Sequence, residues 1–434
     1  MSRVSSFLAL FLLSLLYSCS SGSDTSSTDA TKATQNAAAP QIAQALPLLS
    51  ISTENGAEIV SREDYLPARF TLKSEDGQVL LDGTTEIRGR GHDTWTIYPK
   101  KPYHMKLTNS SSLLGMPANK HWVLLANYSD KTLMRNDLVF QLSQWVGMEY
   151  TPRSKFVDVE LNSVYQGIYQ LTEHIRISPD RVNIPELKVG DTAPDRITGG
   201  YLLEIDELRD EVFCIDSAIN ILMTFCLKNP ETLLEAGWEA QRAYIEEYLA
   251  QTEEALFSNN FKDPVLGYAA YIDVDSAVNW YLVNEIVKNP DADMQHSTFL
   301  FKKRNGKLTF GPVWDFDIAV GNNNFRNGDK TDGWFVRLAP WYARMFEDPI
   351  FSAKVKAKWA QLKATGRLDD LLKYIDKQAL YLSKVQVKNF QTWDILSIWV
   401  QDNRVVTGSY TGEVAATRDW LRDRIAWMDG EFAK

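Results

Sequence analysis

The sequence predicts a bilobal α+β fold in which a sheet-rich N-lobe precedes a helix-rich C-lobe. Short β-prone runs separated by Gly, Pro and Asp-Gly fill the chain from residue 48 to 205, and amphipathic segments of helical length follow from residue 232. With 434 residues, of which 44% are hydrophobic, the chain can bury a sizeable core. Strands and helices that are segregated along a chain are typical of the α+β class. A cleft between two such lobes is the natural place for a ligand.

The first half of the folded part carries the predicted strands and one clear helix. That helix follows Ser129 or Asp130, either of which can serve as an N-cap, and it ends at Gly147. The predicted strands are Leu48–Ser52, Ala68–Leu72, Val79–Leu81, Thr85–Gly89, Tyr103–Leu107, Trp122–Leu125, Phe156–Leu161, Tyr165–Leu171 and Gly200–Ile205. Most neighbouring runs are joined by short turns, so we expect a mainly antiparallel sheet.

The second half is predicted to be helical. Apolar residues recur there at helical spacing, and Asp273 or Asp275 can cap the second segment. The predicted helices are Thr232–Ser258, Asp273–Val287, Ile350–Thr365, Arg367–Asn389 and Glu413–Glu431.

A hairpin interrupts these helices. Two apolar-rich runs, Ser297–Lys303 and Lys307–Val313, flank the turn Arg304-Asn305-Gly306. Asn-Gly between β-prone runs is a strong hairpin signal. Because the start of the first strand lies beside the end of the second in an antiparallel hairpin, the flanking segments should meet at its open end.

Both flanking segments are acidic. Asp291 and Asp293 precede the first strand, and Asp315 and Asp317 follow the second. Four carboxylates brought together repel one another unless a cation or a proton lies among them. Oxygen ligands suit Mg²⁺ or Ca²⁺, so a divalent-metal site is the leading interpretation. The alternative is that these aspartates cap helices and hold turns.

The N-terminus resembles an export signal. Arg3 precedes an apolar run, Phe7–Leu16, that is too short to span a bilayer, and Cys19 follows a Leu-x-Ser pattern. Residues 1–19 therefore resemble a bacterial lipoprotein signal with lipidation at Cys19; the alternative is a plain signal peptide with an incidental cysteine. We expect an exported, membrane-anchored lipoprotein at the outer membrane or cell surface.

A polar tether and a single folded domain should follow the signal. Residues 20–46 are rich in Ser, Thr, Ala and Gln, a composition that favours disorder. The folded domain is expected over residues 47–434, with an N-lobe of about 47–205 and a C-lobe of about 206–434. Its partners are not expected to include nucleic acid, because the formal charge is −10 and the pI is about 5.2.

Cys214 and Cys226 are candidates for a disulfide. In an exported protein they are more often bonded than free, and a turn near Asn220 would set them opposite each other on two strands. The alternative is a pair of buried thiols out of register.

A basic segment precedes the first helix. Arg88 and Arg90 alternate with glycines after a predicted strand, which suits phosphate binding but equally suits an exposed tight turn. Lys106 alternates with apolar residues on a strand, where it is either paired or extended to a sheet edge.

The five histidines give no metal-ligand spacing. His92, His104, His121 and His174 are scattered, and His296 lies near the aspartates as a metal neighbour, a base or a structural residue. Serine hydrolase and zincin motifs are absent from the sequence.

Six motifs in chain order resemble the spore coat protein H (CotH) kinase-like family from about residue 50 to about residue 325. They are RGRG with KKPYHMKL, LLANYSDKTLMRN, LNSVYQGIYQLTEHI, GGYLLEID, YIDVDSAVNWYLVNEIVKNPDAD and GPVWDFDIAVGN. The resemblance implies an atypical protein-kinase-like fold, and characterised members of that family transfer phosphate from ATP to protein serine.

The resemblance implies roles for the acidic residues. Asp291 takes the place of the catalytic-loop aspartate, which accepts or orients the proton of the substrate hydroxyl. Asp315 takes the place of the Mg²⁺-binding aspartate of Asp-Phe-Gly. His296 stands where protein kinases carry an asparagine ligand for a second metal, so Asp317 or Asp293 substitutes for it or the site holds one metal.

The resemblance also implies roles for basic and interlobe residues. Lys106 would pair with the phosphates of ATP, and Arg88 and Arg90 would lie near the phosphate tail. Glu204, or Glu173, would lie towards the connection between the lobes.

The expected function is phosphate transfer from ATP to a protein Ser or Thr hydroxyl with Mg²⁺. The alternative is a non-catalytic surface module that uses the same carboxylates, loaded with Ca²⁺, to bind a partner. Glycoside hydrolysis by two carboxylates is a third possibility, supported by their number alone.

Overall fold

The computed structural model describes residues 42–206, 212–219 and 223–434. The expected signal, the lipidation site Cys19 and most of the tether lie outside these residues. Packed structure begins before Pro47, contrary to expectation, because Ala43 and Leu46 are buried and the Ala43 amide donates to the Tyr381 carbonyl at 3.0 Å. Within the described ranges, no helix is long and apolar enough to cross a membrane.

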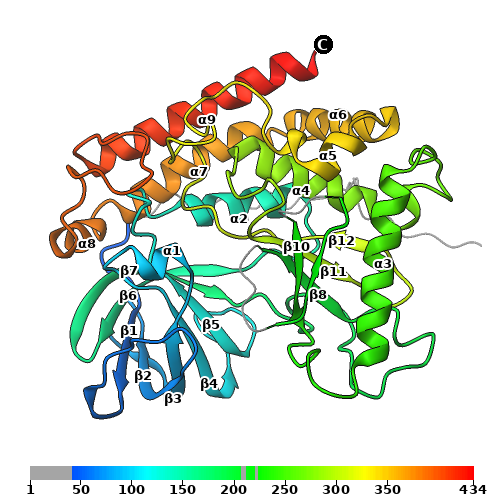
Figure 1. Ribbon diagram of the computed structural model, residues 1–434. Helices are drawn as coiled ribbons and strands as arrows, with labels where there is room; N and C mark the ends of the chain where they lie inside the picture. Colours follow the sequence, from blue (N-terminus) through cyan, green and yellow to red (C-terminus); the bar gives the residue numbers. More distant parts are fainter. Residues whose placement is uncertain (1–41, 207–211, 220–222) are drawn as a thin grey trace, which may run out of the picture. The chain divides into compact units, whose positions relative to one another are not determined.

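The first seven strands form a closed barrel (Figure 1). They are β1 (Leu48–Thr53), β2 (Leu66–Lys73), β3 (Val79–Gly89), β4 (Tyr103–Ser111), β5 (Asn119–Leu125), β6 (Ser154–Leu161) and β7 (Val164–Glu173), in the order β1-β2-β3-β4-β5-β7-β6. Parallel pairing of β1 with β6, at Leu48↔Asp158, closes the sheet. The sequence predicts the strands but not this closure, which depends on pairing between distant segments. The two runs predicted at Val79–Leu81 and Thr85–Gly89 are one strand, because the chain stays extended through Asp82 and Gly83.

Alternate residues of the barrel strands fill its interior. Ile87, Met105, Trp122 and Tyr169 are fully buried and belong to a core separate from that of the rest of the domain. Their strand neighbours therefore face outwards.

The other five strands form a second sheet. They are β8 (Tyr201–Ile205), β9 (Cys214–Asp216), β10 (Thr224–Asn229), β11 (Thr298–Lys302) and β12 (Leu308–Phe310), in the order β12-β11-β8-β10-β9. β8 is expected among the first-half strands, but it pairs with β11 of the hairpin at Thr298↔Ile205. The first set of strands therefore ends at β7. At the other edge Cys214 and Cys226 are opposite each other in the β9–β10 ladder and are joined by a disulfide.

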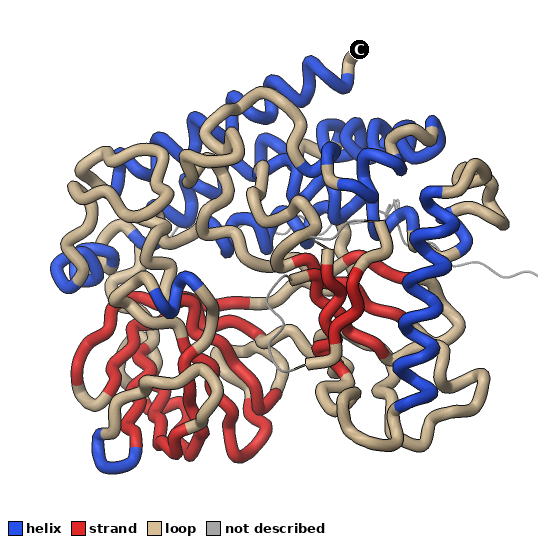
Figure 2. The backbone as a smooth tube through the Cα atoms, viewed as in Figure 1, coloured by secondary structure: helices blue, strands red, loops and turns tan. Residues whose placement is uncertain are grey.

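Most of the helices gather on one side of both groups of strands, whereas α3 runs along the second sheet (Figure 2). The helices of the described ranges are α1 (Asp93–Thr96), α2 (Arg135–Val146), α3 (Glu239–Phe257), α4 (Val274–Val287), α5 (Pro340–Met345), α6 (Pro349–Ala364), α7 (Arg367–Leu382), α8 (Gln386–Thr392) and α9 (Tyr410–Phe432), with short 3-10 turns at Glu54–Gly56, Tyr268–Ala270 and Val336–Leu338. The expected cap of α4 is confirmed, because the Asp273 side chain accepts from the Ser276 amide at 3.1 Å. The expected start of α2 is wrong: the helix begins at Arg135, and Asp130 holds a polar turn before it.

Helix α4 is the centre of the larger core and lies against α2, α6 and α9. A fully buried ion pair, Arg424–Glu285 at 2.6 Å, ties α9 to α4.

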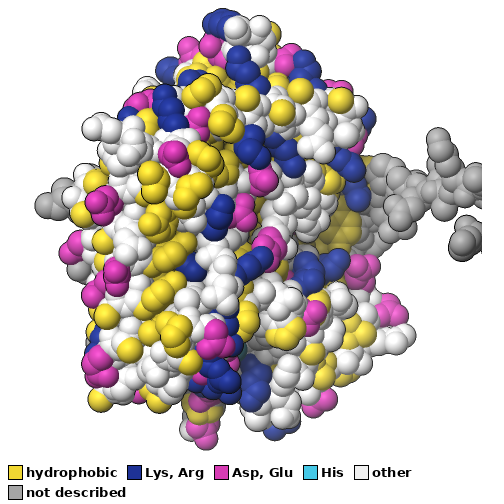
Figure 3. Space-filling view, turned by 90° about the vertical axis from the view of Figure 1, so that its right-hand side faces the viewer, with side chains coloured by type: hydrophobic (Ala, Val, Ile, Leu, Met, Phe, Trp, Pro, Cys, Tyr) yellow, Lys and Arg dark blue, Asp and Glu magenta, His cyan; other side chains and the backbone are white. Residues whose placement is uncertain are grey.

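Basic, acidic and apolar side chains are intermingled over the face that carries α3 (Figure 3).

Candidate active site

The hairpin β11–β12 has the expected geometry. Leu300 pairs with Phe310 and Lys302 with Leu308, and Asn305 adopts a positive φ of 51° at the turn. Beyond the ladder, the Gly311 amide still donates to the Phe299 carbonyl at 2.8 Å. The open end therefore brings the segment before Thr298 to the segment after Phe310, as predicted.

Asp315 is held from both sides of this open end. Its carbonyl accepts from the Asn289 side chain at 3.3 Å, and its Oδ2 accepts from the Ser297 hydroxyl at 3.4 Å. The next amide, of Phe316, donates to Asn136 Oδ1 of α2 at 2.9 Å. Asp315 itself has a φ of 66°, a strained conformation for a residue other than glycine, which is frequent at functional sites.

Asp291, Asp315 and Asp317, three of the four predicted aspartates, have raised pKa values and are coupled to one another. Burial, and next the charge of Asp315, raise the pKa of Asp291 to about 8. The same two causes raise the pKa of Asp317 to about 7. Burial also raises the pKa of Asp315, against the opposing effect of Arg90. The three carboxyls, which we call the aspartate cluster, therefore share one region and favour a proton or a cation there.

Asp293, the fourth predicted residue, also raises the pKa of Asp291, but it has an ion-pair partner of its own. It forms an ion pair with Arg326 at 2.7 Å, and Arg326 is the main group that opposes the raised pKa caused by its burial. Arg326 thus offsets the charge of Asp293 through Oδ2, although burial still leaves its pKa raised.

Arg90 links the barrel to the aspartate cluster. Its guanidinium lies over the Trp314 ring, 5.4 Å from the centroid. Burial lowers the pKa of Arg90, and Asp315, Glu204 and Asp317 oppose that shift. Glu204 of β8, the predicted interlobe residue, also forms an ion pair with Lys228 at 2.9 Å. Arg90 and Glu204 therefore both lie within electrostatic range of the aspartate cluster.

Lys106 and Arg88 have other partners. Lys106 forms a half-exposed ion pair with Glu86 across β3 and β4, at 3.0 Å. The Arg88 guanidinium donates to the Arg62 carbonyl and lies over the Tyr65 ring, 4.8 Å from its centroid. Among the described residues, no hydrogen bond or ion pair joins either side chain to the aspartate cluster.

Glu173, the other interlobe candidate, has a structural role. It is fully buried and accepts two hydrogen bonds from the Arg153 side chain, at 2.8 and 3.0 Å, and one from the Tyr150 hydroxyl at 3.1 Å. Its oxygens are already occupied by these donors.

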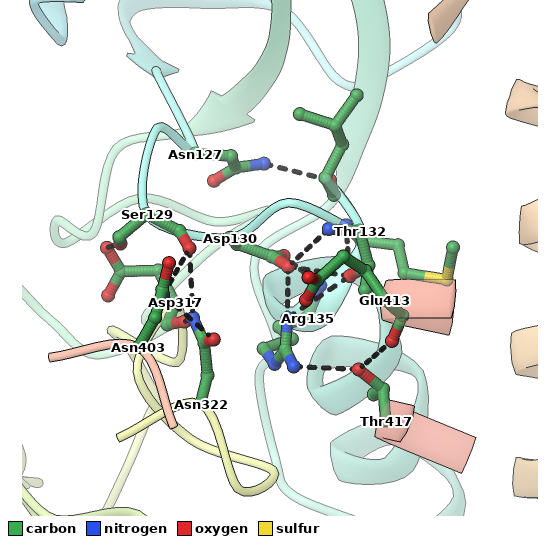
Figure 4. Close-up of polar contacts among 12 residues, drawn as sticks. Asn127, Ser129, Asp130, Thr132, Arg135, Asp317, Asn322, Asn403, Glu413 and Thr417 are labelled. Carbon is green, nitrogen blue, oxygen red and sulfur yellow. Dashed lines mark hydrogen bonds and ion pairs between the residues drawn. The ribbon is translucent and has the colours of Figure 1, made fainter. Parts of the chain in front are cut away.

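A polar network fixes Asp317 (Figure 4). The Ser129 hydroxyl donates to Asp317 Oδ2 at 3.1 Å, and the Asn322 side-chain Nδ2 donates to the Asp317 carbonyl at 2.7 Å. Asn403, from the loop before α9, donates to the Ser129 carbonyl at 2.9 Å. Segments far apart in the sequence thus meet behind one carboxylate.

The same network contains a buried ion pair, Asp130–Arg135 (Figure 4). Asp130 also accepts from the Thr132 amide at 2.9 Å and from the Arg135 amide at 2.7 Å. Arg135 donates onward to the Ala319 carbonyl at 3.1 Å and to Thr417 of α9 at 2.7 Å. The pair therefore joins the start of α2, the segment after Asp317, and α9. The motif YSDKTLMRN contains these residues, but its spacing alone gave them no role.

Asp206 is a further acidic residue near the cluster, and it is not among the residues predicted from the sequence. It follows β8, raises the pKa of Asp315, and lies 3.9 Å from His296 Nδ1. His296 in turn lowers the pKa of Asp291. The histidine is thus positioned between two acidic groups. The signal was the Asp at the end of GGYLLEID, which pairing of β8 with β11 brings to the hairpin.

The described residues contain no ready-made group of three His, Cys, Asp or Glu side chains able to hold a metal ion. Mg²⁺ does not require one, because it is usually bound by one or two carboxylates together with water and phosphate oxygens.

The model of the CotH kinase protein family matches residues 86–428. The chain belongs to this family. The CotH match covers Arg90, the hairpin, the aspartate cluster and the network behind Asp317. Membership of this family indicates a kinase-like protein. No curated protein shows significant similarity to it.

Proposed function

We propose that this CotH protein transfers the terminal phosphate of ATP to a Ser or Thr hydroxyl of a protein, with Mg²⁺. The observation that carries the proposal is the aspartate cluster, in which burial and the charge of Asp315 raise the pKa of Asp291 to about 8 and that of Asp317 to about 7, and burial also raises the pKa of Asp315. Such a cluster is unfavourable without a positive charge and is suited to a cation and a phosphate tail.

The donor set fits Mg²⁺. Asp315 and Asp317 offer carboxylate oxygens, and a serine hydroxyl orients each of them, Ser297 at 3.4 Å and Ser129 at 3.1 Å. Magnesium, when bound, supplies positive charge that neutralises these carboxylates and the phosphate oxygens of the nucleotide.

The protein's own residues then have separate tasks. Asp291, whose pKa is about 8 beside Asp315, takes the proton of the substrate hydroxyl on a carboxylate oxygen. Arg90 provides a fixed positive charge on the barrel side, where negative charge develops on the phosphate. His296, between Asp206 and Asp291, helps hold the loop that carries the base.

We further propose that the domain is a bilobal kinase-like unit. The barrel would serve as the N-lobe, and β8 to α9 as the C-lobe. This moves the expected boundary from residue 205 to the segment between β7 and β8. Lipidation at Cys19 would place the enzyme at the outer membrane or cell surface, with a protein as its substrate.

Calorimetric titration of the purified protein with Mg-ATP tests the proposal. Saturable binding that is lost in Asp315→Asn supports it. Absence of binding at millimolar nucleotide contradicts it, as does equal binding by wild type and variant. Stabilisation by Ca²⁺ with no effect of nucleotide would instead favour the non-catalytic module.

A further inference from the structure

Three of the chain's five histidines meet on the outer face of the barrel, although their sequence spacing gave no sign of it. His104 lies on β4, His121 on β5, and His174 directly after β7. The rings of His104 and His174 are stacked, with centroids 4.4 Å apart and planes 5° apart, and His121 lies 5.3 Å from His104. Pairing of β4 with β5 and of β5 with β7 brings them together.

A hydrogen-bond chain orders these rings. Tyr65 Oη lies 3.0 Å from His104 Nδ1, and His104 Nε2 lies 3.2 Å from His121 Nδ1. With the phenol as donor, the proton of neutral His104 is on Nε2 and is donated to His121, whose own proton is then on Nε2. This series of hydrogen bonds therefore ends at the Nε2–H group of His121, which is a donor.

Cations surround the three rings. Burial first, and then neighbouring positive charges, lower the pKa of each imidazole, and that of His121 falls to about 3. The charged neighbours are Arg88, Arg90, Lys106, Lys120, Arg176 and Arg181. Two nearby acids are paired: Glu86 with Lys106, and Glu173 with both Arg153 and Arg181. This region is therefore positive in a chain whose formal charge is −10.

Three buried nitrogen atoms in this group have no hydrogen-bond partner among the described residues. They are Arg88 Nε, Arg181 Nη2 and His174 Nδ1. Buried polar groups without partners are rare in native proteins and commonly indicate a missing water or ion. A metal cation fits poorly beside the guanidinium groups. An anion would satisfy the two arginine N–H donors, and His174 Nδ1 in the tautomer that carries its proton there, and would also offset the positive charge. Water would satisfy the donors but would not offset the charge.

We infer that the histidine–arginine cluster, formed by His104, His121, His174, Arg88, Arg176 and Arg181, binds a phosphate group. Its ligand is a tetrahedral oxyanion, held by guanidinium N–H groups and by the imidazole donors. The site goes beyond the proposed function, because it requires neither Mg²⁺ nor transfer. The phosphate comes either from free inorganic phosphate or from the tail of a nucleotide.

NMR of the five histidines tests this inference directly. The full-length protein is titrated with sodium phosphate in EDTA, with sodium chloride at matched ionic strength as the reference. The ring signals of His104, His121 and His174 should shift saturably with phosphate, while those of exposed His92 should not. Equal shifts with chloride and phosphate, or unsaturable shifts at all five histidines, would overturn the inference.

Arg176→Gln provides the variant, because this half-exposed arginine can be replaced without opening the buried core. Loss of one charge-assisted contact should weaken phosphate binding about tenfold. Arg69→Gln, at an exposed arginine on β2, is the matched control and should bind phosphate as wild type does. Equal affinities for wild type and Arg176→Gln, or equal losses in both variants, would contradict the assignment.

ATP without metal then distinguishes the two sources. Competition between ATP and phosphate for the same histidine shifts indicates the nucleotide tail, and simultaneous binding indicates a separate anion site. Phosphate binding without any Mg-ATP binding would leave this inference in place while contradicting the proposed function.

Discussion

The aspartate cluster and the histidine–arginine cluster are alike in construction and opposite in sign. Each gathers titratable groups of one kind, and in each the pKa moves towards the neutral form, upwards for Asp291 and downwards for His121. Arg90 influences both, since it lowers the pKa of His104 and of Asp315. The difference lies in what would relieve each cluster: a cation for the aspartates, and an anion for the ring of cations around the histidines. A nucleotide–metal complex carries both charges.

The largest expected effect concerns the catalytic base. Asp291→Asn should lower phosphate transfer by about 10²- to 10⁴-fold, the usual contribution of a general base, while Mg-ATP still binds. Transfer is measured with ATP labelled at the terminal phosphate and a generic protein acceptor.

Asp293→Asn is the matched control, because Asp293 forms an ion pair with Arg326 and is not one of the three carboxyls of the aspartate cluster. Its activity should stay close to that of wild type. Equal losses of activity in the two variants would contradict the role of Asp291 as the catalytic base.

The next effect concerns the support behind Asp317. Arg135→Ala leaves the fully buried Asp130 without its ion-pair partner, so the free energy of unfolding should fall by about 3–5 kcal/mol. Urea unfolding measures this loss.

Arg418→Ala breaks an exposed ion pair with Asp376 and should cost no more than about 1 kcal/mol. If Arg135→Ala is equally mild, then the network of Figure 4 does not hold the aspartate segment.

The histidine side should make the protein sensitive to acid. Below pH 6.5 the unfolded chain takes up a proton at His121, whereas the folded chain does so only near pH 3. Stability should therefore fall as the pH drops through this window, by up to about 1.4 kcal/mol per pH unit for one histidine. Unfolding free energies of wild type and His121→Gln between pH 4.5 and 7 test this, and parallel curves would contradict it.

The aspartate side should respond in the opposite direction. The unfolded carboxyl ionises near pH 3.8, whereas folded Asp291 holds its proton up to about pH 8 and Asp317 up to about pH 7. Their contribution to stability is full below pH 3.8 and is lost as the pH rises to these values. Because Mg²⁺ displaces the protons, its effect on Tm should grow from pH 6 to pH 8. A pH-independent Mg²⁺ effect would contradict this.

The sequence predicted the hairpin that brings the aspartates together, but it did not predict the meeting of the histidines. The Asn305-Gly306 hairpin is a local signal, so it correctly brought Asp315 towards Asp291. The same local logic failed for Asp130, whose side chain bonds the Arg135 backbone and side chain instead of capping a helix at that point. Closure of the barrel and the meeting of His104, His121 and His174 depend on strand order, which no short motif encodes. Asp206 was missed for the same reason, since β8 joins the hairpin sheet only in three dimensions.

The claim that Asp315 and Asp317 hold one divalent ion beside Asp291 can be tested by crystallography with Mn²⁺ and ATP. Anomalous scattering locates Mn²⁺ without ambiguity. Mn²⁺ can be coordinated by carboxylate oxygens or by imidazole nitrogens, so its position distinguishes the two clusters. The account predicts an anomalous peak bonded to Asp315 and Asp317, with the nucleotide phosphates beside it. A peak at the three histidines, or nucleotide bound with no metal at the aspartates, would contradict it.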